Sequence, residues 1–329
     1  MGEFAKADEV LANAITLARE TSNSIALGTT LLNSSFLYSL TAEFTKGMNN
    51  NDSAIAIFKR SGNIVRLAHT YGSRGTLLKY MGEYRQSIIA NLFTDSVYKD
   101  ELLTENRGII LNNIGTAYLD QSDYQNALRY FKQSLALLQK GVIDESYFLV
   151  QANIAECFYD LKKPSDAKAL FLDILPKARK VNLNRIASGM ALILGKIYEE
   201  ENKLQEASSY FNYAKEYALA SGEKDKIIEA LMNLGKINAA EGKKDSAENN
   251  LRNATELVKK YKTPTVWSSY YELGLLFYGL HKFDSSIIYF RQAVELSHNN
   301  AENLYGGEAV KQIFNNYPRK STLNTTTPF

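Results

Sequence analysis

Polar side chains recur along the chain at a constant interval and could form a row of hydrogen-bonding groups. The row reads Asn33, Ser73, Asn113, Asn153 and, after Ile193 interrupts it, Asn233. An asparagine side chain carries a donor and an acceptor together, which matches the N–H and C=O groups of an extended peptide backbone whatever the sequence of the peptide. The row therefore predicts a peptide-binding surface. The alternative, that these residues make local polar contacts within the protein, stays open.

A second set of side chains lies three or six residues after this row, on the same stripe of a helix. It comprises Thr116, Glu156, Lys196, Lys236, Tyr159 and Glu199. Their charges are mixed, so we do not expect the continuous basic set that would clamp the C-terminal carboxylate of a peptide. Lys196 and Lys236 could still hold one acidic group of a ligand.

Residues that could perform catalysis are few and are not grouped. His69 falls on the binding stripe, but no Ser, Cys or carboxylate stands at a spacing that would form a triad with it, so we expect it to line the surface. The single cysteine, Cys157, lies inside a helical pattern and is expected in the core. No Cys/His cluster has the spacing of metal ligands. We therefore predict a protein that is not an enzyme and that has no cofactor and no metal.

The helices that must position these residues are clearest in the segment 111–138. Its apolar and small residues fall at helical spacing in two groups, separated by the polar turn 120–123. The groups are Leu111, Ile114, Gly115 and Tyr118, then Tyr124, Ala127, Phe131 and Ser134. Gly115 and Ala127 allow two antiparallel helices to cross closely, and Phe131 can fill the seam to the next pair. Because one such pair leaves an apolar face that only a neighbour covers, the pattern predicts an array.

The small residue of the first helix recurs through the whole chain. It reads Ser35, Gly75, Gly115, Ala155, Gly195, Gly235 and Gly274, at a constant interval except that the last is one residue shorter. A large apolar residue on the second helix follows the same period as Phe131, Phe171, Phe211, Leu251 and Phe290, with Asn51 and Asn91 in its place in the first two units. We predict seven full repeats over about residues 28–300, a half repeat at 1–22 and a capping helix at 302–317. These would form one domain over 1–317, followed by a disordered tail at 318–329.

The pattern resembles the tetratricopeptide repeat, in which a large residue, Leu-Gly and Tyr lie on helix A, and Ala and an aromatic residue lie on helix B. The long period, about 40 residues, with Asn-x-Gly on helix A is similar to the repeats of bacterial peptide-pheromone receptors, the maltose-regulon activator and the spindle-orientation adaptors. This resemblance implies an all-α fold, a right-handed superhelical solenoid whose helix A surface forms the concave inner wall.

The same resemblance implies a scaffold that binds a protein or peptide. We expect the ligand- or partner-sensing part of a bacterial regulatory protein, which binds an extended peptide along the concave helix A surface. The alternative is a stand-alone peptide-responsive regulator that acts by a change in superhelix pitch. A DNA-binding or kinase segment elsewhere in the gene would favour the first of these.

The composition is that of a folded protein, because 45% of the 329 residues are hydrophobic and 22% are charged. Lys and Arg number 38 against 36 Asp and Glu, a net charge of +2 that is too balanced to predict a nucleic-acid or membrane surface. No apolar run has membrane-spanning length, and the first ten residues do not resemble a signal peptide. We expect a cytoplasmic protein, or a periplasmic one if a signal or transmembrane segment has been removed from a longer chain.

The N-terminal half repeat is expected to leave apolar residues uncovered, because a helix B stands there without its helix A. The residues concerned are Phe4, Ala7, Leu11 and Ala14, with Val10 and Ile15 beside them. Either the chain has been cut from a longer array, which we favour, or this face pairs with a second copy in a homodimer.

Overall fold

The computed structural model describes residues 2–41, 43–141, 143–261 and 266–295, and in these ranges the chain forms helices and turns without any strand. The helices are α1 (Gly2–Glu20), α2 (Ser24–Leu40), α3 (Phe44–Ser61), α4 (Ile64–Tyr80), α5 (Tyr84–Asp100), α6 (Thr104–Leu119), α7 (Tyr124–Leu138), α8 (Glu145–Asp160), α9 (Pro164–Lys180), α10 (Asn184–Glu200), α11 (Leu204–Ser221), α12 (Lys224–Ala240), α13 (Lys244–Tyr261) and α14 (Val266–Gly279). A further helix is described over residues 283–295.

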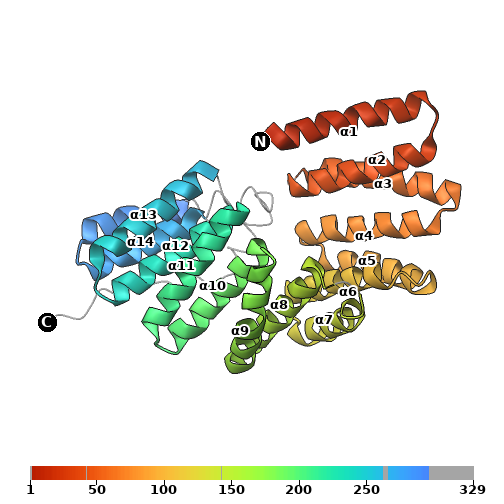
Figure 1. The fold of residues 1–329 in the computed structure, drawn as a ribbon. Helices are drawn as coiled ribbons and strands as arrows, with labels where there is room; N and C mark the ends of the chain where they lie inside the picture. The colour runs from red at the N-terminus through yellow and green to blue at the C-terminus, as the bar shows by residue number, and fades with distance from the viewer. Residues whose placement is uncertain (1, 42, 142, 262–265, 296–329) are drawn as a thin grey trace, which may run out of the picture. The chain divides into compact units, whose positions relative to one another are not determined.

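The helices confirm the all-α fold and the repeat pattern. Each even-numbered helix from α2 to α14 is a helix A, and the helix that follows it is the helix B of the same unit, as Figure 1 allows the reader to follow. Helix α1 spans most of residues 1–22, and that this segment is a half repeat stays a prediction. The predicted capping helix at 302–317 and the tail at 318–329 lie outside the described residues.

The turns between helices recur at a regular interval and explain where each helix ends. One residue of nearly every turn has a left-handed backbone, for example Gly82 (φ 81°), Ser122 (φ 59°) and Asn202 (φ 58°). In such a turn the N–H of the next residue donates to a carbonyl five residues back, as Asp123 does to Tyr118 at 2.9 Å. This bond satisfies a carbonyl at the helix end and stops the helix.

Close crossing of helices A and B depends on the glycine column. A Cβ built on Gly115 would lie 2.5 Å from the ring of Phe131, which is fully buried, and Gly235 has the same relation to Leu251. Phe131 also belongs to a core cluster with Val150 and Ile154 of the next unit. The large residue of helix B therefore packs on its own helix A and also fills the seam to the following repeat.

The chain divides into two compact units, Met1–Ile186 and Ala187–Phe329, with the boundary inside α10. In the N-terminal unit, neighbouring A helices touch, since α2 contacts α4, α4 contacts α6 and α6 contacts α8. In the C-terminal unit, α12 contacts both α13 and α14. Each unit thus has its own stack of helices. That residues 1–317 form a single domain stays a prediction.

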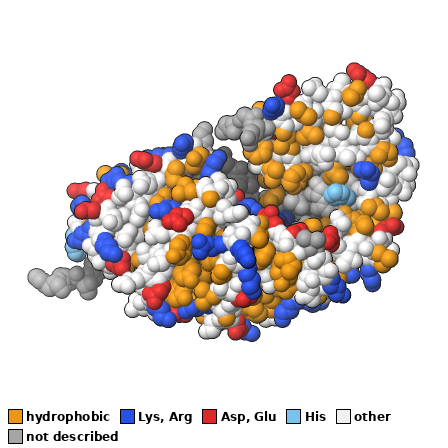
Figure 2. Space-filling view, viewed as in Figure 1, with side chains coloured by type: hydrophobic (Ala, Val, Ile, Leu, Met, Phe, Trp, Pro, Cys, Tyr) orange, Lys and Arg blue, Asp and Glu red, His pale blue; other side chains and the backbone are white. Residues whose placement is uncertain are grey.

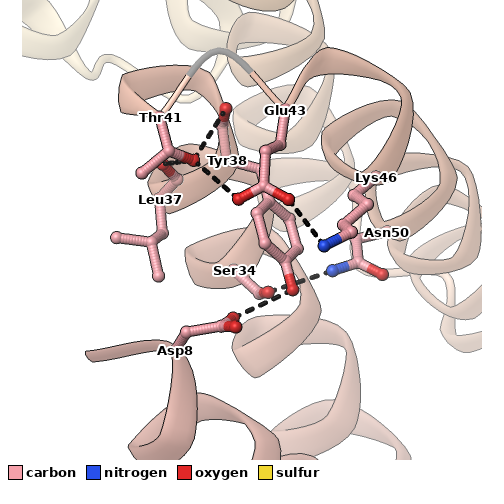
Figure 3. A network of polar contacts seen from close by, with 8 residues as sticks. All are labelled: Asp8, Ser34, Leu37, Tyr38, Thr41, Glu43, Lys46 and Asn50. Atoms are coloured by element: carbon pink, nitrogen blue, oxygen red, sulfur yellow. Dashed lines mark hydrogen bonds and ion pairs between the residues drawn. The ribbon is translucent and has the colours of Figure 1, made fainter. Parts of the chain in front are cut away.

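Polar contacts join α1 and α3 to α2, as Figure 3 shows. The Tyr38 hydroxyl donates to Asp8 Oδ1 at 2.9 Å, and Asn50 Nδ2 of α3 donates to Ser34 Oγ at 3.0 Å. Burial and the bond to Asp8 raise the pKa of Tyr38. Phe4 and Val10 are exposed, as expected for an uncovered helix B, whereas Leu11, Ala14 and Ile15 are half-buried. Pairing of two copies through this helix stays a prediction.

None of the helices in the described ranges is both long enough and apolar enough to cross a bilayer.

Candidate ligand-binding surface on the A helices

Three members of the predicted polar row lie together in the N-terminal unit. Asn33 of α2, Ser73 of α4 and Asn113 of α6 line a hollow of about 500 Å³ on neighbouring A helices. We call it the first hollow, and its lining is Leu32, Asn33, Phe36, His69, Gly72, Ser73, Thr76, Tyr98, Asn106, Ile109, Ile110 and Asn113. The regular spacing of the repeats therefore does bring these side chains to one surface.

The first hollow is largely apolar around its polar row. Phe36 and Ile109 are exposed hydrophobic side chains that line it, and Figure 2 shows apolar side chains on the surface of this unit. His69, expected from the sequence to line the surface, does so. His69 is an exposed residue, but partial burial of its side chain and, secondly, the charge of nearby Arg66 lower the pKa of His69. The imidazole is thus biased towards its neutral form, in keeping with an apolar hollow.

A smaller and more polar hollow adjoins the first, because the two share Thr76 and Asn113. This second hollow has a volume of about 270 Å³, and its lining is Gly75, Thr76, Lys79, Tyr80, Ser87, Asn91, Asn112, Asn113, Thr116, Leu149, Asn153 and Arg185. Two of these side chains are cationic and none is acidic. Arg185, at the start of α10, still belongs to the N-terminal unit.

Asn153 lines the second hollow, but its side chain is hydrogen-bonded to another residue of the protein. Its side chain is 8% exposed, and its Nδ2 donates to Asn112 Oδ1 at 2.8 Å. Asn113 differs, since its side chain is half-buried and makes no hydrogen bond within the described part of the chain. The two asparagines occupy the same repeat position, yet only Asn113 offers a free carboxamide.

The other predicted residues of the N-terminal unit are half-buried on their helices. Thr116 lines the second hollow, and its hydroxyl donates to the Asn113 carbonyl at 2.9 Å. Glu156 and Tyr159 lie on α8. Cys157, expected in the core, is fully buried there, and burial raises the pKa of its thiol to about 12.

In the C-terminal unit the predicted residues form a balanced set of charges. Lys196 Nζ lies 2.7 Å from Glu229 Oε1, and Lys236 Nζ lies 3.0 Å from Glu272 Oε1. Both lysines and Asn233, which is 7% exposed, line a hollow of about 300 Å³. The lysines are therefore already neutralised by carboxylates of the next A helix, which weakens the case that they hold an acidic group of a ligand.

Several lining residues were not predicted, although some stand in predicted columns. Phe36 and Thr76 occupy the repeat position of Thr116, and Lys79 occupies that of Tyr159. Following each column back to the first repeats would have found them. Arg185 has no such signal, because it reaches the second hollow from the first turn of α10.

Comparison with known families agrees with the geometry of the helix pairs. Family models described as tetratricopeptide repeat match residues 106–180 and 268–300. No curated protein matches the sequence of the chain.

Solved structures share the fold at low sequence identity. The apo form of RapI is 15% identical with a TM-score of 0.66, covering 84% of this chain and 99% of RapI. A Rap protein complexed with competence and sporulation factor is 13% identical with a TM-score of 0.61, covering 92% of this chain and 97% of that one. The apo form of the quorum sensor NprR from B. thuringiensis is 14% identical with a TM-score of 0.59, covering 89% and 99%. The fold is therefore an all-α solenoid of tetratricopeptide repeats.

Proposed function

Because the chain is built from tetratricopeptide repeats, we propose that it is a non-enzymatic scaffold that binds an extended peptide or partner segment along its A helices. The observation that carries this proposal is the first hollow. An apolar lining with a few polar groups is typical of ligand sites, since apolar area supplies affinity and polar groups fix orientation. Here Phe36 and Ile109 supply apolar area. The polar groups are those of Asn33, Ser73 and Asn113.

The free hydrogen-bonding capacity of the row supports a peptide as the ligand. Asn33, Ser73 and Asn113 make no side-chain hydrogen bond within the described residues. Their amides and hydroxyl can therefore bind the backbone of a ligand in exchange for water, at a net gain of about 0.5–1.5 kcal/mol for each bond. A row of such groups along neighbouring helices suits a chain molecule better than a compact metabolite.

A role as the sensing part of a regulator is the finer form of this proposal. NprR is described as a quorum sensor, and the Rap protein was solved in complex with competence and sporulation factor. These descriptions belong to those proteins, which share the fold of this chain. We propose by analogy that the ligand here is a signal or a segment of a partner protein.

The test is direct binding of fluorescein-labelled hexapeptides from a positional-scanning library, measured by fluorescence anisotropy. Wild type should bind some pools, and Asn33→Ala with Asn113→Ala should weaken that binding roughly tenfold, the loss expected from about two hydrogen bonds. Asn49→Ala, an exposed position on the helix B α3, is the matched control. The absence of any binding pool, or a double variant that binds like wild type, would refute the proposal.

A further inference from the structure

A hollow in the C-terminal unit, separate from the first and second hollows, is lined mainly by apolar side chains. It has a volume of about 340 Å³ and lies where α12, α13 and α14 meet. We call it the leucine hollow, after the four leucines that line it: Leu251, Leu275, Leu276 and Leu280. Its volume falls within the usual range of small-molecule sites, roughly 300–1,000 Å³, and an apolar lining is typical of such sites.

Smaller side chains at two repeat positions leave this space open. Leu251 stands at the position of Phe171 and Phe211 in the two preceding repeats. Ala239 stands at the position that Tyr159 occupies two repeats earlier. Both Leu251 and Ala239 line the leucine hollow. The hollow is therefore a feature of this one repeat and is not a general consequence of the array.

The lining of the leucine hollow does not suit a peptide backbone. Among the described residues that line it, none has an amide or hydroxyl side chain. A peptide would bring N–H and C=O groups that lose their bonds to water and find few partners in return. The first hollow differs, because Asn33, Ser73 and Asn113 line it. The leucine hollow therefore favours a ligand whose body is a hydrocarbon.

The charged side chains of the leucine hollow favour an anionic head group on that ligand. Two cations and one anion line it, Lys236, Lys244 and Glu272, which leaves one positive charge in excess. Lys236 Nζ lies 3.0 Å from Glu272 Oε1, so these two charges compensate each other. Lys244 is exposed at the start of α13, and its side chain makes no interaction with the part of the chain that the structure describes. Its ammonium group can therefore pair with an anion at the mouth of the hollow.

From the apolar lining and the uncompensated lysine we propose that the leucine hollow binds a medium-chain fatty acid. The hydrocarbon chain packs against Leu251 and Leu276, which are 2% and 8% exposed, and the carboxylate pairs with Lys244. This site is additional to the proposed peptide site, because it shares no lining residue with the first or the second hollow.

The experiment is isothermal titration calorimetry of the full chain with saturated fatty acids from hexanoate to dodecanoate, below the concentrations at which they form micelles. Each added methylene should strengthen binding about fourfold, the gain from burying one CH₂ group, until the chain fills the hollow and the affinity stops rising. Decan-1-ol has no charge and should bind up to about fivefold more weakly than decanoate, the effect of one exposed ion pair. Equal affinity along the series of acids would contradict an apolar site.

The role of Lys244 is tested by comparing decanoate with decan-1-ol on variants. Lys244→Gln should bind the two molecules with nearly equal affinity. Lys260→Gln removes the same charge from the exposed far end of α13 and should keep the difference. Loss of the difference in both variants would show that the carboxylate responds only to the overall charge of the protein.

The location of the ligand is tested by filling the leucine hollow. Leu251→Phe and Ala239→Tyr each introduce the larger side chain of another repeat and should weaken decanoate binding roughly tenfold or more, the loss of about two buried methylenes. Because Ala239 is exposed, Ala239→Tyr decides the question if Leu251→Phe does not fold, as judged by melting. Phe36→Asn, in the first hollow, is the control and should bind decanoate like wild type.

Three results would overturn the inference. They are failure of every acid to bind, decanoate binding as tight in Ala239→Tyr as in wild type, and loss of decanoate binding in Phe36→Asn, which would place the acid in the first hollow. If no acid binds and Ala239→Tyr instead weakens the binding of hexapeptides, the hollow belongs to a peptide. The proposed function is tested separately, through Asn33 and Asn113.

Discussion

Phe211 lies so close to Gly195 that a Cβ on the glycine would come within 2.5 Å of the phenylalanine ring. Phe211 is fully buried and cannot move aside without disturbing its neighbours. We predict that Gly195→Ala destabilises the protein by about 1–3 kcal/mol through overpacking. Urea unfolding followed by circular dichroism would measure the change.

The control for this variant lies on the same helix. A Cβ on Gly189 would meet only the end of the flexible Lys226 side chain, at 3.6 Å. Gly189→Ala should therefore raise stability by up to about 1 kcal/mol, because alanine favours the helix. Equal effects of the two substitutions would show that the crossing is not tight.

Asn113 and Asn153 should behave differently although they occupy the same repeat position. Asn153→Ala removes the donor to Asn112 Oδ1 and leaves a largely buried acceptor unpaired, so we expect a loss of about 1–3 kcal/mol in stability. Asn113→Ala should leave the unfolding midpoint nearly unchanged and weaken peptide binding. An Asn153→Ala variant with the same free energy of unfolding as wild type would contradict the buried hydrogen bond.

The difference between Asn113 and Asn153 could not be predicted from the repeat period, although much of the fold could. The constant repeat period predicts the helices, the glycine crossings and the surface that Asn33, Ser73 and Asn113 share. It does not predict that Asn153 turns to Asn112, because a repeat position fixes the place on a helix but not the partner that the side chain finds. The second hollow could not be predicted from the sequence either. Asn91 departs from the repeat pattern, and Arg185 lies at a repeat position that the pattern does not place on the binding surface.

Glu199 on α10 should make stability depend on pH. Burial, with smaller effects from Glu200 and Glu272, raises the pKa of Glu199 above its ordinary value of 4.5, against the opposite effect of Lys236 and Lys196. The folded state therefore favours the protonated carboxyl. Its contribution is fully present below the ordinary pKa and is lost as the pH rises through the folded pKa.

Glu199→Gln should accordingly be more stable than wild type at pH 7 and no more stable at pH 4. Urea midpoints at the two pH values would measure this. Glu216→Gln, at an exposed position of α11, removes the same charge from the same unit and serves as the comparison. A gain of the same size for Glu199→Gln at both pH values would show that burial of the charge is not the cause.

Cys157 should react slowly with iodoacetamide in the native protein. Its side chain is fully buried, and the pKa of its thiol is raised to about 12 by burial, with further effects from Glu156 and Asp160. Only the thiolate reacts, so modification at pH 8 should require opening of the N-terminal unit. Mass spectrometry after timed quenching would follow it, with urea-unfolded protein as the fast reference. Rapid modification in native buffer would contradict the buried position.

The contact between successive A helices has a consequence for the shape of a bound chain. Helices in contact lie about 8–10 Å apart, and α2, α4 and α6 touch in turn. A polyproline II strand advances about 3.1 Å per residue and completes a turn in three residues, or about 9 Å. A ligand in that conformation would present the same edge to Asn33, Ser73 and Asn113 at every third residue. The spacing between successive A helices would then match the pitch of the bound peptide.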